Sequence, residues 1–303
     1  MIPGGAFLKY CIDFIGYGEA AYNISKGLQS VRKTPMIAFD IQSESPERGE
    51  LIRSRMAEVG VDYARTAEEA IADCKYIITF TSPAFSYDVA KNLIGKLKPG
   101  QIYLDMNSTA PTTMEAIDKL PRPDGVRFCD VSLLDNIAAG KHLTKMLICG
   151  EGGKEFLEFI SDYTPNARYL DTPIGSASAV KMFKSVFSKG LPQLLIECLV
   201  PAAEYGVYNL VFEGVKDTFK TRTLEQFGDN VVYRTLIHSK RRAAEMKDVS
   251  VTLESMGFGA EVSRAVEKRL RRLAEYGYPQ KIGQTAPNLR EVVEMVRQDD
   301  RLN

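Results

Sequence analysis

Short apolar runs alternate with amphipathic segments from the start of the chain to about residue 170. Runs such as YIITF (76–80) and MLIC (146–149) are continuous, which is typical of parallel strands that helices cover on both faces. The predicted strands are residues 9–15, 35–40, 76–81, 101–105, 126–132, 146–149 and 167–170. Helical patterns lie between them at 20–31, 46–59, 66–73, 85–97, 111–120 and 154–161. The repeated order of strand, helix and strand predicts an α/β domain with a doubly wound parallel sheet.

Helical periodicity replaces this pattern from about residue 173. Apolar residues recur at helical spacing along 179–198, where we expect Gly190 and Pro192 to break or kink the helix. Further helices are predicted at 224–227, 233–254, 260–276 and 289–300. The chain is therefore expected to form two domains, an α/β domain over 1–172 and an all-helical domain over 173–303.

Charge and cysteine usage exclude some classes of function. The 39 Lys and Arg residues equal the 39 Asp and Glu residues, so the basic excess typical of a nucleic-acid-binding protein is absent. The five cysteines are scattered without a CxxC pair, and with only two histidines they provide no metal-ligand spacing. The apolar run near the N-terminus is interrupted by Lys9 and Asp13, and no run of about 18 apolar residues follows. We expect a cytoplasmic protein with no metal, no nucleic-acid partner and no membrane span.

The segment IDFIGYGEAAYNISKGL contains Gly16, Gly18 and Ala21 as G-x-G-x-x-A, directly after a predicted strand and at the start of a predicted helix. Gly16 would permit the tight turn, and Gly18 has no Cβ to obstruct a pyrophosphate that binds the N–H groups of the helix. This segment predicts a Rossmann dinucleotide site, with Tyr17, Glu19 and Ala20 as further contacts. The alternative is a glycine turn in a similar fold that binds no nucleotide.

Asp40 ends the second predicted strand, where an acidic side chain accepts hydrogen bonds from the adenosine ribose and repels a 2′-phosphate. The first arginine after it is Arg48. We therefore predict NAD as the cofactor, with NADP as the alternative.

Lys181 begins the helical part of the chain, after a run of small residues at 175–179. Lys184 follows one helical turn later, and lysines at this spacing usually form a solvated face. The location at the predicted domain junction favours a catalytic role for Lys181, because clefts form at such junctions.

Three segments together give a more specific indication: FIGYGEAA (14–21), DMNSTAP (105–111) and GSASAVKM (175–182). The chain resembles the β-hydroxyacid dehydrogenase superfamily, which includes 6-phosphogluconate and 3-hydroxyisobutyrate dehydrogenases. It is most similar to the branch with a putative phosphogluconate-dehydrogenase-type C-terminal domain, to which D-apionate oxidoisomerase is also similar. The resemblance covers nearly the whole chain.

The resemblance implies roles for particular residues. Lys181 would be the general acid/base, because Gly175 to Lys181 match the family motif G-x-G-x-x-x-K with one Gly-to-Ala change. Asn107, Ser108 and Thr109 would contact the substrate, although their segment matches the family loop loosely. Thr81, Ser82 and Pro83 resemble a segment that passes near the nicotinamide ribose.

The chain also departs from the family pattern. Lys184 and Ser185 occupy the positions where the family has asparagine after the lysine. Ser132 is followed by Leu133 to Asn136 in place of a Ser-Gly-Gly motif that presents N–H groups to a carboxylate. We therefore expect the carboxylate pocket to be built differently, with Lys184 as one candidate substrate contact.

His238, Arg241 and Arg242 resemble a helix that faces the cleft in this branch, and an arginine can bind a carboxylate through two hydrogen bonds. The alternative is a charged helix face on which Glu245 pairs with one of the arginines. For His238 alone, a partly buried polar contact is the more common role.

These observations predict hydride transfer between a nicotinamide cofactor and the secondary alcohol of a small hydroxy acid, either a 3-hydroxy acid or a sugar acid. One alternative is an imine reductase, which has a similar architecture but replaces the lysine. Another is a dinucleotide-binding regulator without catalysis. The resemblance implies a homodimer with interlocking helical domains, whereas the apolar stripe along 179–203 would otherwise be a core helix.

Overall fold

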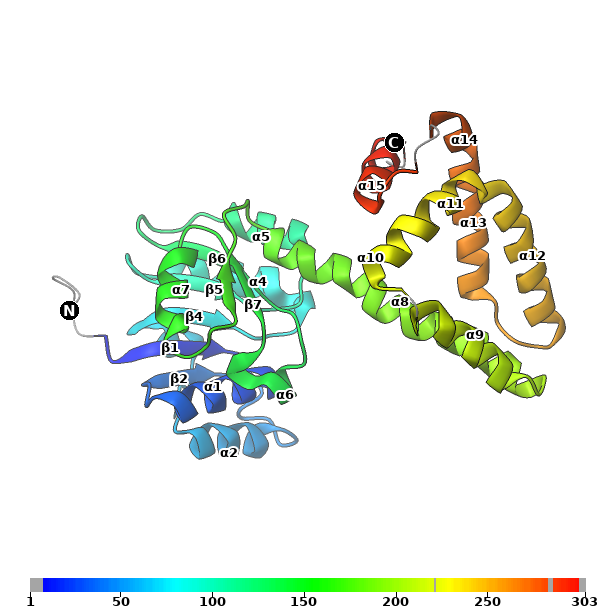
Figure 1. Cartoon of the computed structure of the whole chain (residues 1–303). Helices are drawn as coiled ribbons and strands as arrows, with labels where there is room; N and C mark the ends of the chain where they lie inside the picture. Colours follow the sequence, from blue (N-terminus) through cyan, green and yellow to red (C-terminus); the bar gives the residue numbers. More distant parts are fainter. Residues whose placement is uncertain (1–7, 221, 283–285, 300–303) are drawn as a thin grey trace. The chain divides into compact units, whose positions relative to one another are not determined.

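The computed structural model describes residues 8–220, 222–282 and 286–299 (Figure 1). The chain forms two compact units, Met1–Val186 and Phe187–Asn303. The boundary falls inside helix α8 (Ser176–Glu204), so the first turns of this helix belong to the first unit. The predicted change of pattern at residue 173 lies just before α8 begins.

The described part of the first unit contains an eight-stranded sheet in the order β3-β2-β1-β4-β5-β6-β7-β8. Its strands are β1 (Tyr10–Ile15), β2 (Met36–Phe39), β3 (Asp62–Tyr63), β4 (Cys74–Thr79), β5 (Ile102–Asp105), β6 (Arg127–Leu133), β7 (Met146–Cys149) and β8 (Ala167–Tyr169). The predicted α/β fold with a doubly wound sheet is confirmed. One pairing departs from the prediction, because β7 runs antiparallel to β6. Only the short elements α6 (Ile137–Gly140) and η3 (Lys141–Leu143) join these strands, and no long crossover helix of the kind that usually connects parallel strands lies between them.

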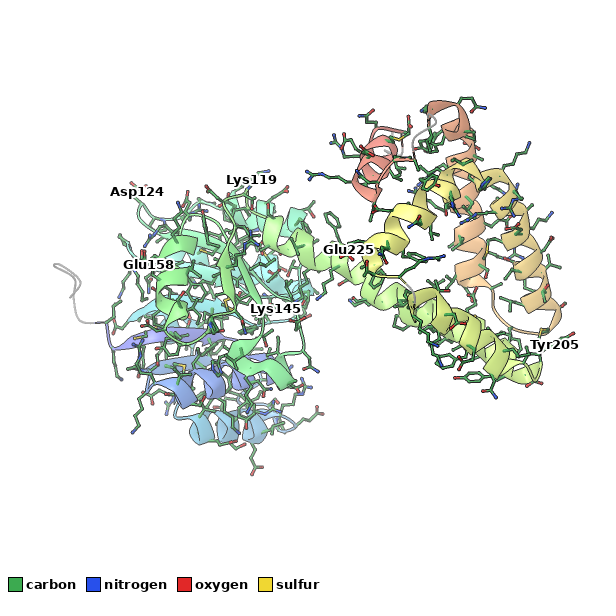
Figure 2. The ribbon with its side chains drawn as sticks, in the orientation of Figure 1. Lys119, Asp124, Lys145, Glu158, Tyr205 and Glu225 are labelled. Atoms are coloured by element: carbon green, nitrogen blue, oxygen red, sulfur yellow. The ribbon has the colours of Figure 1, made fainter. Side chains whose placement is uncertain are left out.

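Helices cover both faces of this sheet (Figure 1). Buried side chains of α1 (Glu19–Val31), α2 (Gly49–Val59) and α7 (Gly153–Ser161) pack on one face. Those of α3 (Ala67–Ile71), α4 (Ser86–Leu93) and α5 (Pro111–Asp118) pack on the other. The short 3₁₀ segments η1 (Pro83–Phe85) and η2 (Ile94–Lys96) flank α4. Charged side chains such as Lys119, Asp124 and Glu158 are exposed on the outside (Figure 2).

Helix α8 is continuous over 29 residues, with Pro192 and Pro201 inside it. Of the two outcomes predicted for Gly190 and Pro192, a break does not occur. An internal proline costs roughly 3 kcal/mol relative to alanine, and the surrounding turns of this long apolar helix offset that cost.

Helix α8 is also, among the described residues, the one helix long and apolar enough to cross a membrane by length and composition. No membrane span was predicted here, because Lys181, Lys184, Lys189 and Glu197 interrupt the apolar residues. Its first turn and its centre are bonded to other parts of the protein. Asp130 in β6 binds Ser178, and Glu197 accepts hydrogen bonds from the N–H groups of Val262 and Ser263 at 2.8 and 2.7 Å.

The described part of the second unit is helical. It comprises the rest of α8, then α9 (Tyr208–Lys220), α10 (Leu224–Phe227), the π-helical segment η4 (Gly228–Val232), α11 (Tyr233–Ile237), α12 (Ser239–Ser255), α13 (Glu261–Glu275), α14 (Tyr278–Lys281) and α15 (Leu289–Asp299). Its core contains Leu236, Leu273, Tyr278 and Val292. Two expectations were incomplete: the helices α9 and α14 were not predicted, and the helix expected over 233–254 is divided at His238.

Candidate dinucleotide and substrate site

In the sheet, β2 and β3 lie on one side of β1, and β4 and the later strands lie on the other side. The order in which successive strands are added therefore changes direction between β1 and β4. Ligands of doubly wound sheets bind at the carboxyl ends of the strands at this switch point. Successive backbone hydrogen bonds align those ends: the N–H of Phe80 donates to the carbonyl of Ile15, and the N–H of Met106 donates to the carbonyl of Thr79. The segments that follow β1, β4 and β5 therefore emerge side by side.

Gly16 forms the turn after β1 with a φ of +90°, a conformation that favours glycine. A Cβ at this position would collide with the carbonyl group of Phe80, lying 2.8 Å from its carbon atom, and would lie 3.2 Å from Cγ2 of Thr81. The glycine turn therefore touches the start of the segment Thr81-Ser82-Pro83. Two sequence-predicted parts of the cofactor site are adjacent in the structure. Thr81 is partly exposed, and Ser82 and Pro83 are exposed.

Gly18 precedes the first residue of α1, and no side chain caps that end of the helix. Nothing lies within 4 Å of the place where a Cβ of Gly18 would be, so the space above the turn is open. Glu19 and Ala20 form the first turn of α1. The Tyr17 side chain is directed away from this space, because it is fully buried and its hydroxyl lies 2.6 Å from Oγ of Ser25. Only the backbone of Tyr17 is placed to contact a nucleotide.

Asp40 follows β2 and is joined to the glycine turn. Its Oδ2 accepts a hydrogen bond from the N–H of Tyr17 at 2.7 Å, and its Oδ1 accepts one from the N–H of Gln42 at 2.8 Å. Arg48 is close by, because its Nη1 donates to Oε1 of Gln42 at 3.3 Å. The carboxylate predicted to bind ribose is thus held in a fixed orientation beside the turn, with one arginine nearby.

The segment after β5 begins at Asp105, whose side chain is fully buried. Ser86 Oγ–H donates to Oδ2 of Asp105, and the N–H of Asn107 donates to Oδ1 at 2.9 Å. Burial raises the pKa of Asp105 to about 6, although the hydrogen bonds from Ser86 and Asn107 act in the opposite direction. These bonds fix the start of the predicted substrate loop.

The side chains of Asn107 and Thr109 are 4% and 5% exposed. The amide nitrogen and oxygen of Asn107 and the hydroxyl of Thr109 have no hydrogen-bond partner among the described residues. Such buried, unpaired groups are rare in native proteins and are expected to bind a further molecule. Ser108, between them, is exposed.

The motif that contains Lys181 begins against this loop. Gly175 has a φ of +91°, and a Cβ on it would lie 3.1 Å from the carbonyl oxygen of Pro111. Residues 105–111 and 175–181, which are far apart in sequence, are therefore in contact within the first unit. Lys181 is partly buried on the second turn of α8, and its carbonyl accepts a hydrogen bond from the Ser185 hydroxyl at 2.9 Å.

Lys184 is paired with the segment that departs from the family pattern. Its Nζ lies 3.3 Å from Oδ1 of Asp135 and 3.4 Å from the carbonyl oxygen of Leu134. Both charged side chains are about half exposed, so the pair is screened by water and contributes little to stability. A substrate that uses Lys184 would compete with Asp135.

The pair formed by Asp130 and Ser178 was not recognised from the sequence. Asp130 in β6 is fully buried, and its two oxygens accept hydrogen bonds from the backbone N–H and the hydroxyl of Ser178. The available signal was an acidic residue inside the otherwise apolar run FCDVSLL (128–134). A charge in such a run requires a partner, but the sequence does not identify which one.

His238, Arg241 and Arg242 lie in the second unit. His238 is an exposed residue between α11 and α12. Arg241 forms an ion pair with Glu245, as the alternative for this helix predicted, and Arg242 donates to Oγ1 of Thr235 at 2.6 Å. A substrate role for these three residues remains a prediction.

Comparisons with known proteins agree with this architecture. Residues 202–273 match a domain of unknown function, DUF1932. An uncharacterized 28.5 kDa protein from Methanothermus fervidus is 25% identical over 238 residues, which are 78% of this chain and 88% of that protein. The solved structure of the conserved protein MTH1747, described as similar to 3-hydroxyacid dehydrogenases, is 24% identical with a TM-score of 0.58, and the match covers 88% of this chain and 98% of that one.

Two enzymes share the fold at lower identity. A reductive aminase from Aspergillus terreus, solved with NADPH and ethyl levulinate, is 14% identical with a TM-score of 0.69 over 95% of this chain and all of the other. An imine reductase from Myxococcus stipitatus, solved with NAD+, is 16% identical with a TM-score of 0.70 over 95% and 99%. The chain therefore shares the fold of 3-hydroxyacid-dehydrogenase-like proteins and of imine reductases, and it carries a DUF1932 segment.

Proposed function

We propose that this chain is an NAD(P)-dependent oxidoreductase. The observation that carries the proposal is the glycine turn of Gly16 and Gly18 at the switch point of the sheet. The turn leaves the N-terminus of α1 uncapped below an open space, and it contacts the segment that begins at Thr81. Backbone N–H groups and the helix dipole at such an end favour a pyrophosphate. Proteins of the same fold have been solved with NADPH and NAD+.

NAD is the proposed cofactor. The Tyr17 N–H orients the Asp40 carboxylate beside the turn, where it can accept hydrogen bonds from ribose hydroxyls and repel a 2′-phosphate. Arg48 near Gln42 is the feature that favours NADP instead.

Fluorescence titration of the full chain with NADH and, separately, with NADPH tests both statements. We expect NADH to bind at least about tenfold more tightly, a difference of about 1.4 kcal/mol. A preference for NADPH would contradict the choice of NAD and would leave the enzyme class intact. Binding of neither nucleotide at high micromolar concentration would contradict the proposal as a whole.

The proposed reaction converts the secondary alcohol of a small hydroxy acid to a carbonyl, or the reverse. The bound cofactor would supply a hydride acceptor or donor at its nicotinamide ring. Lys181 would take the hydroxyl proton at Nζ and return it in the opposite direction. Asn107 and Thr109 would orient the substrate, since their buried polar atoms have no partner among the described residues. Ser108 and Lys184 are further proposed contacts, and Lys184 would have to exchange Asp135 for a substrate carboxylate.

An imine reductase is the second candidate, favoured by the similarity of fold to the Aspergillus terreus and Myxococcus stipitatus enzymes. Lys181 argues against it, because the imine reductase alternative has another residue in place of this lysine. Parallel screens with hydroxy acids plus NAD and with cyclic imines plus NADH distinguish the two. Activity in neither screen, together with tight NADH binding, would favour a dinucleotide-binding regulator.

We further propose that the protein is a homodimer formed through α8 and α9. Large apolar side chains on these two helices are exposed, including Ile196 at 54%, Val200 at 49% and Leu210 at 78%. An apolar surface of this extent is usually covered by a partner protein. A second copy of this chain would present the same exposed apolar side chains on its own α8 and α9. Light scattering after gel filtration should give twice the monomer mass of 33.7 kDa. Ile196→Glu with Leu210→Glu should give the monomer, and the control Lys240→Glu should not.

A cytoplasmic location is proposed on the basis of the cysteines. All five are free thiols, and those of Cys74, Cys129 and Cys149 are buried. Unpaired thiols persist in reducing compartments. Fractionation of cells that express the full chain tests this location, and recovery with the membranes would contradict it.

A further inference from the structure

Asp130 and Ser178 form a buried contact between the sheet and helix α8. Oδ2 of Asp130 accepts the backbone N–H of Ser178 at 3.0 Å, and Oδ1 accepts its hydroxyl at 2.7 Å. The exposed fractions of Asp130 and Ser178 are 0% and 1%. The Cys149 thiol also lies 3.5 Å from Oδ2. Both oxygens of Asp130 thus bind groups of the protein itself.

This contact replaces an ordinary helix cap. Ser178 is the third residue of α8, and the first N–H groups of a helix have no partner within the helix. A residue at the start of a helix usually supplies that partner from its own side chain, but Gly175 has none. Asp130, 48 residues earlier in the sequence, supplies it from the middle of β6. Its negative charge also suits the positive end of the helix dipole.

The first turn of α8 is held from a second side. Gly175 lies against Pro111 at the end of the substrate loop, so closely that a Cβ would be 3.1 Å from the Pro111 carbonyl oxygen. Asp105, next to Asp130 in the register of β5 and β6, holds the other end of that loop through the N–H of Asn107. Two neighbouring buried carboxylates therefore fix the loop and the helix that together form the proposed substrate side of the site.

We infer that Asp130 is a positioning residue for Lys181. Lys181 lies three residues after Ser178, less than one helical turn away, so an anchor on Ser178 fixes the point from which the amine extends. A misplacement of about 1 Å in a catalytic group can lower a rate by a factor of about 100. This inference rests on the proposed role of Lys181 as general acid/base.

The test compares variants that weaken the anchor with a matched control. Ser178→Ala removes the hydroxyl bond to Asp130 and leaves the charge of Asp130 unchanged. Ser178→Thr keeps the hydroxyl and should restore the bond. Ser185→Ala is the control, because it removes another serine hydroxyl from the same helix, one bonded to the Lys181 carbonyl. Asp130→Asn is a stronger second variant.

Two measurements need no identified substrate. The first is the rate at which the Lys181 amine is acetylated by acetic anhydride as a function of pH, followed by peptide mass spectrometry. The second is the Kd for NADH. In Ser178→Ala we expect the Lys181 profile to change at least about threefold in rate or to move along the pH axis, with the NADH Kd within a few-fold. Ser178→Thr should return the profile toward that of the wild-type protein, and Ser185→Ala should leave it in place.

Superposition of the Ser178→Ala and wild-type profiles would overturn the inference. So would an equal change in Ser185→Ala, which would mean that any perturbation of the helix has this effect. If Asp130→Asn does not fold, the serine variants still decide the question. The labelling profile does not depend on turnover, so a Lys181 variant with normal turnover would remove the proposed catalytic role without altering this result.

Discussion

The backbone N–H of Tyr17 donates a hydrogen bond to Oδ2 of Asp40 over 2.7 Å, which connects the glycine turn to the end of β2. The turn that would bind a pyrophosphate and the carboxylate that would bind a ribose are therefore one rigid structure. In a dinucleotide the pyrophosphate and the adenosine ribose are joined at a fixed separation. The position of Asp40 relative to the turn therefore affects whether the site prefers NAD or NADP.

Asp40→Ala should lower the preference for NADH over NADPH by about tenfold or more, because the repulsion of a 2′-phosphate and the ribose hydrogen bonds are both lost. The measurement is the ratio of the two Kd values by fluorescence titration. Asp171→Asn, an exposed carboxylate after β8, serves as the control for charge alone. An unchanged ratio in Asp40→Ala would mean that Asp40 has a structural role only.

Lys181→Met should lower turnover by about 100- to 10,000-fold, the usual contribution of a general acid/base. The NADH Kd should stay within a few-fold, because the substitution does not alter the glycine turn. Turnover is measured with a panel of small hydroxy acids and NAD. Lys189→Met, an exposed lysine farther along the same helix, should retain full activity. Equal activity of Lys181→Met and the wild-type protein would exclude Lys181 from the reaction.

Gly175→Ala should lower the free energy of unfolding by about 1–3 kcal/mol, since the backbone is left-handed there and the new methyl group would press on Pro111. Gly190→Ala is the matched substitution on the same helix. Nothing lies within 4 Å of its Cβ position, so it should raise the stability by roughly 0.5–1 kcal/mol. Urea unfolding curves of both variants give the two values. Equal effects would show that the contact with Pro111 does not constrain Gly175.

Asp13 in β1 should make the protein less stable as the pH rises. Its side chain is fully buried, and neither oxygen has a hydrogen-bond partner among the described residues. Burial raises the pKa of Asp13 well above its usual value, so the folded state keeps a proton that the unfolded state releases above about pH 4. The contribution of this group to stability is complete below that pH and is lost progressively as the pH rises toward the folded pKa.

Asp13→Asn removes this dependence. The Tm of the variant should exceed that of the wild-type protein at pH 8, and the difference should shrink on acidification to pH 5. Thermal unfolding followed by circular dichroism across this range measures both proteins. Asp124→Asn, an exposed carboxylate of the same unit (Figure 2), should show no such trend. A constant Tm difference would mean that Asp13 carries the same charge in the folded and unfolded states between pH 5 and pH 8, so that burial does not raise its pKa into or above this range.

The local pattern of the sequence determined the elements of the first unit and the location of the cofactor turn. Continuous apolar runs mark strands that are buried on both faces, and the glycine turn with Asp40 at the next strand end is a local signature of a nucleotide site. The fold class and these positions therefore followed from residues close together in the chain.

Other features were decided only by the tertiary structure. The antiparallel course of β7 depends on how the strands pack in the sheet, and the continuity of α8 through Pro192 depends on the rest of that long helix. The pattern of apolar residues indicated neither feature. The bond between Asp130 and Ser178 joins residues 48 positions apart, and the contact of Gly175 with Pro111 joins two distant motifs. The acidic residue inside the apolar run 128–134 indicated from the sequence that Asp130 needs a partner. Which partner it finds depends on the order of the strands, because that order alone brings the end of β5, the centre of β6 and the start of α8 together.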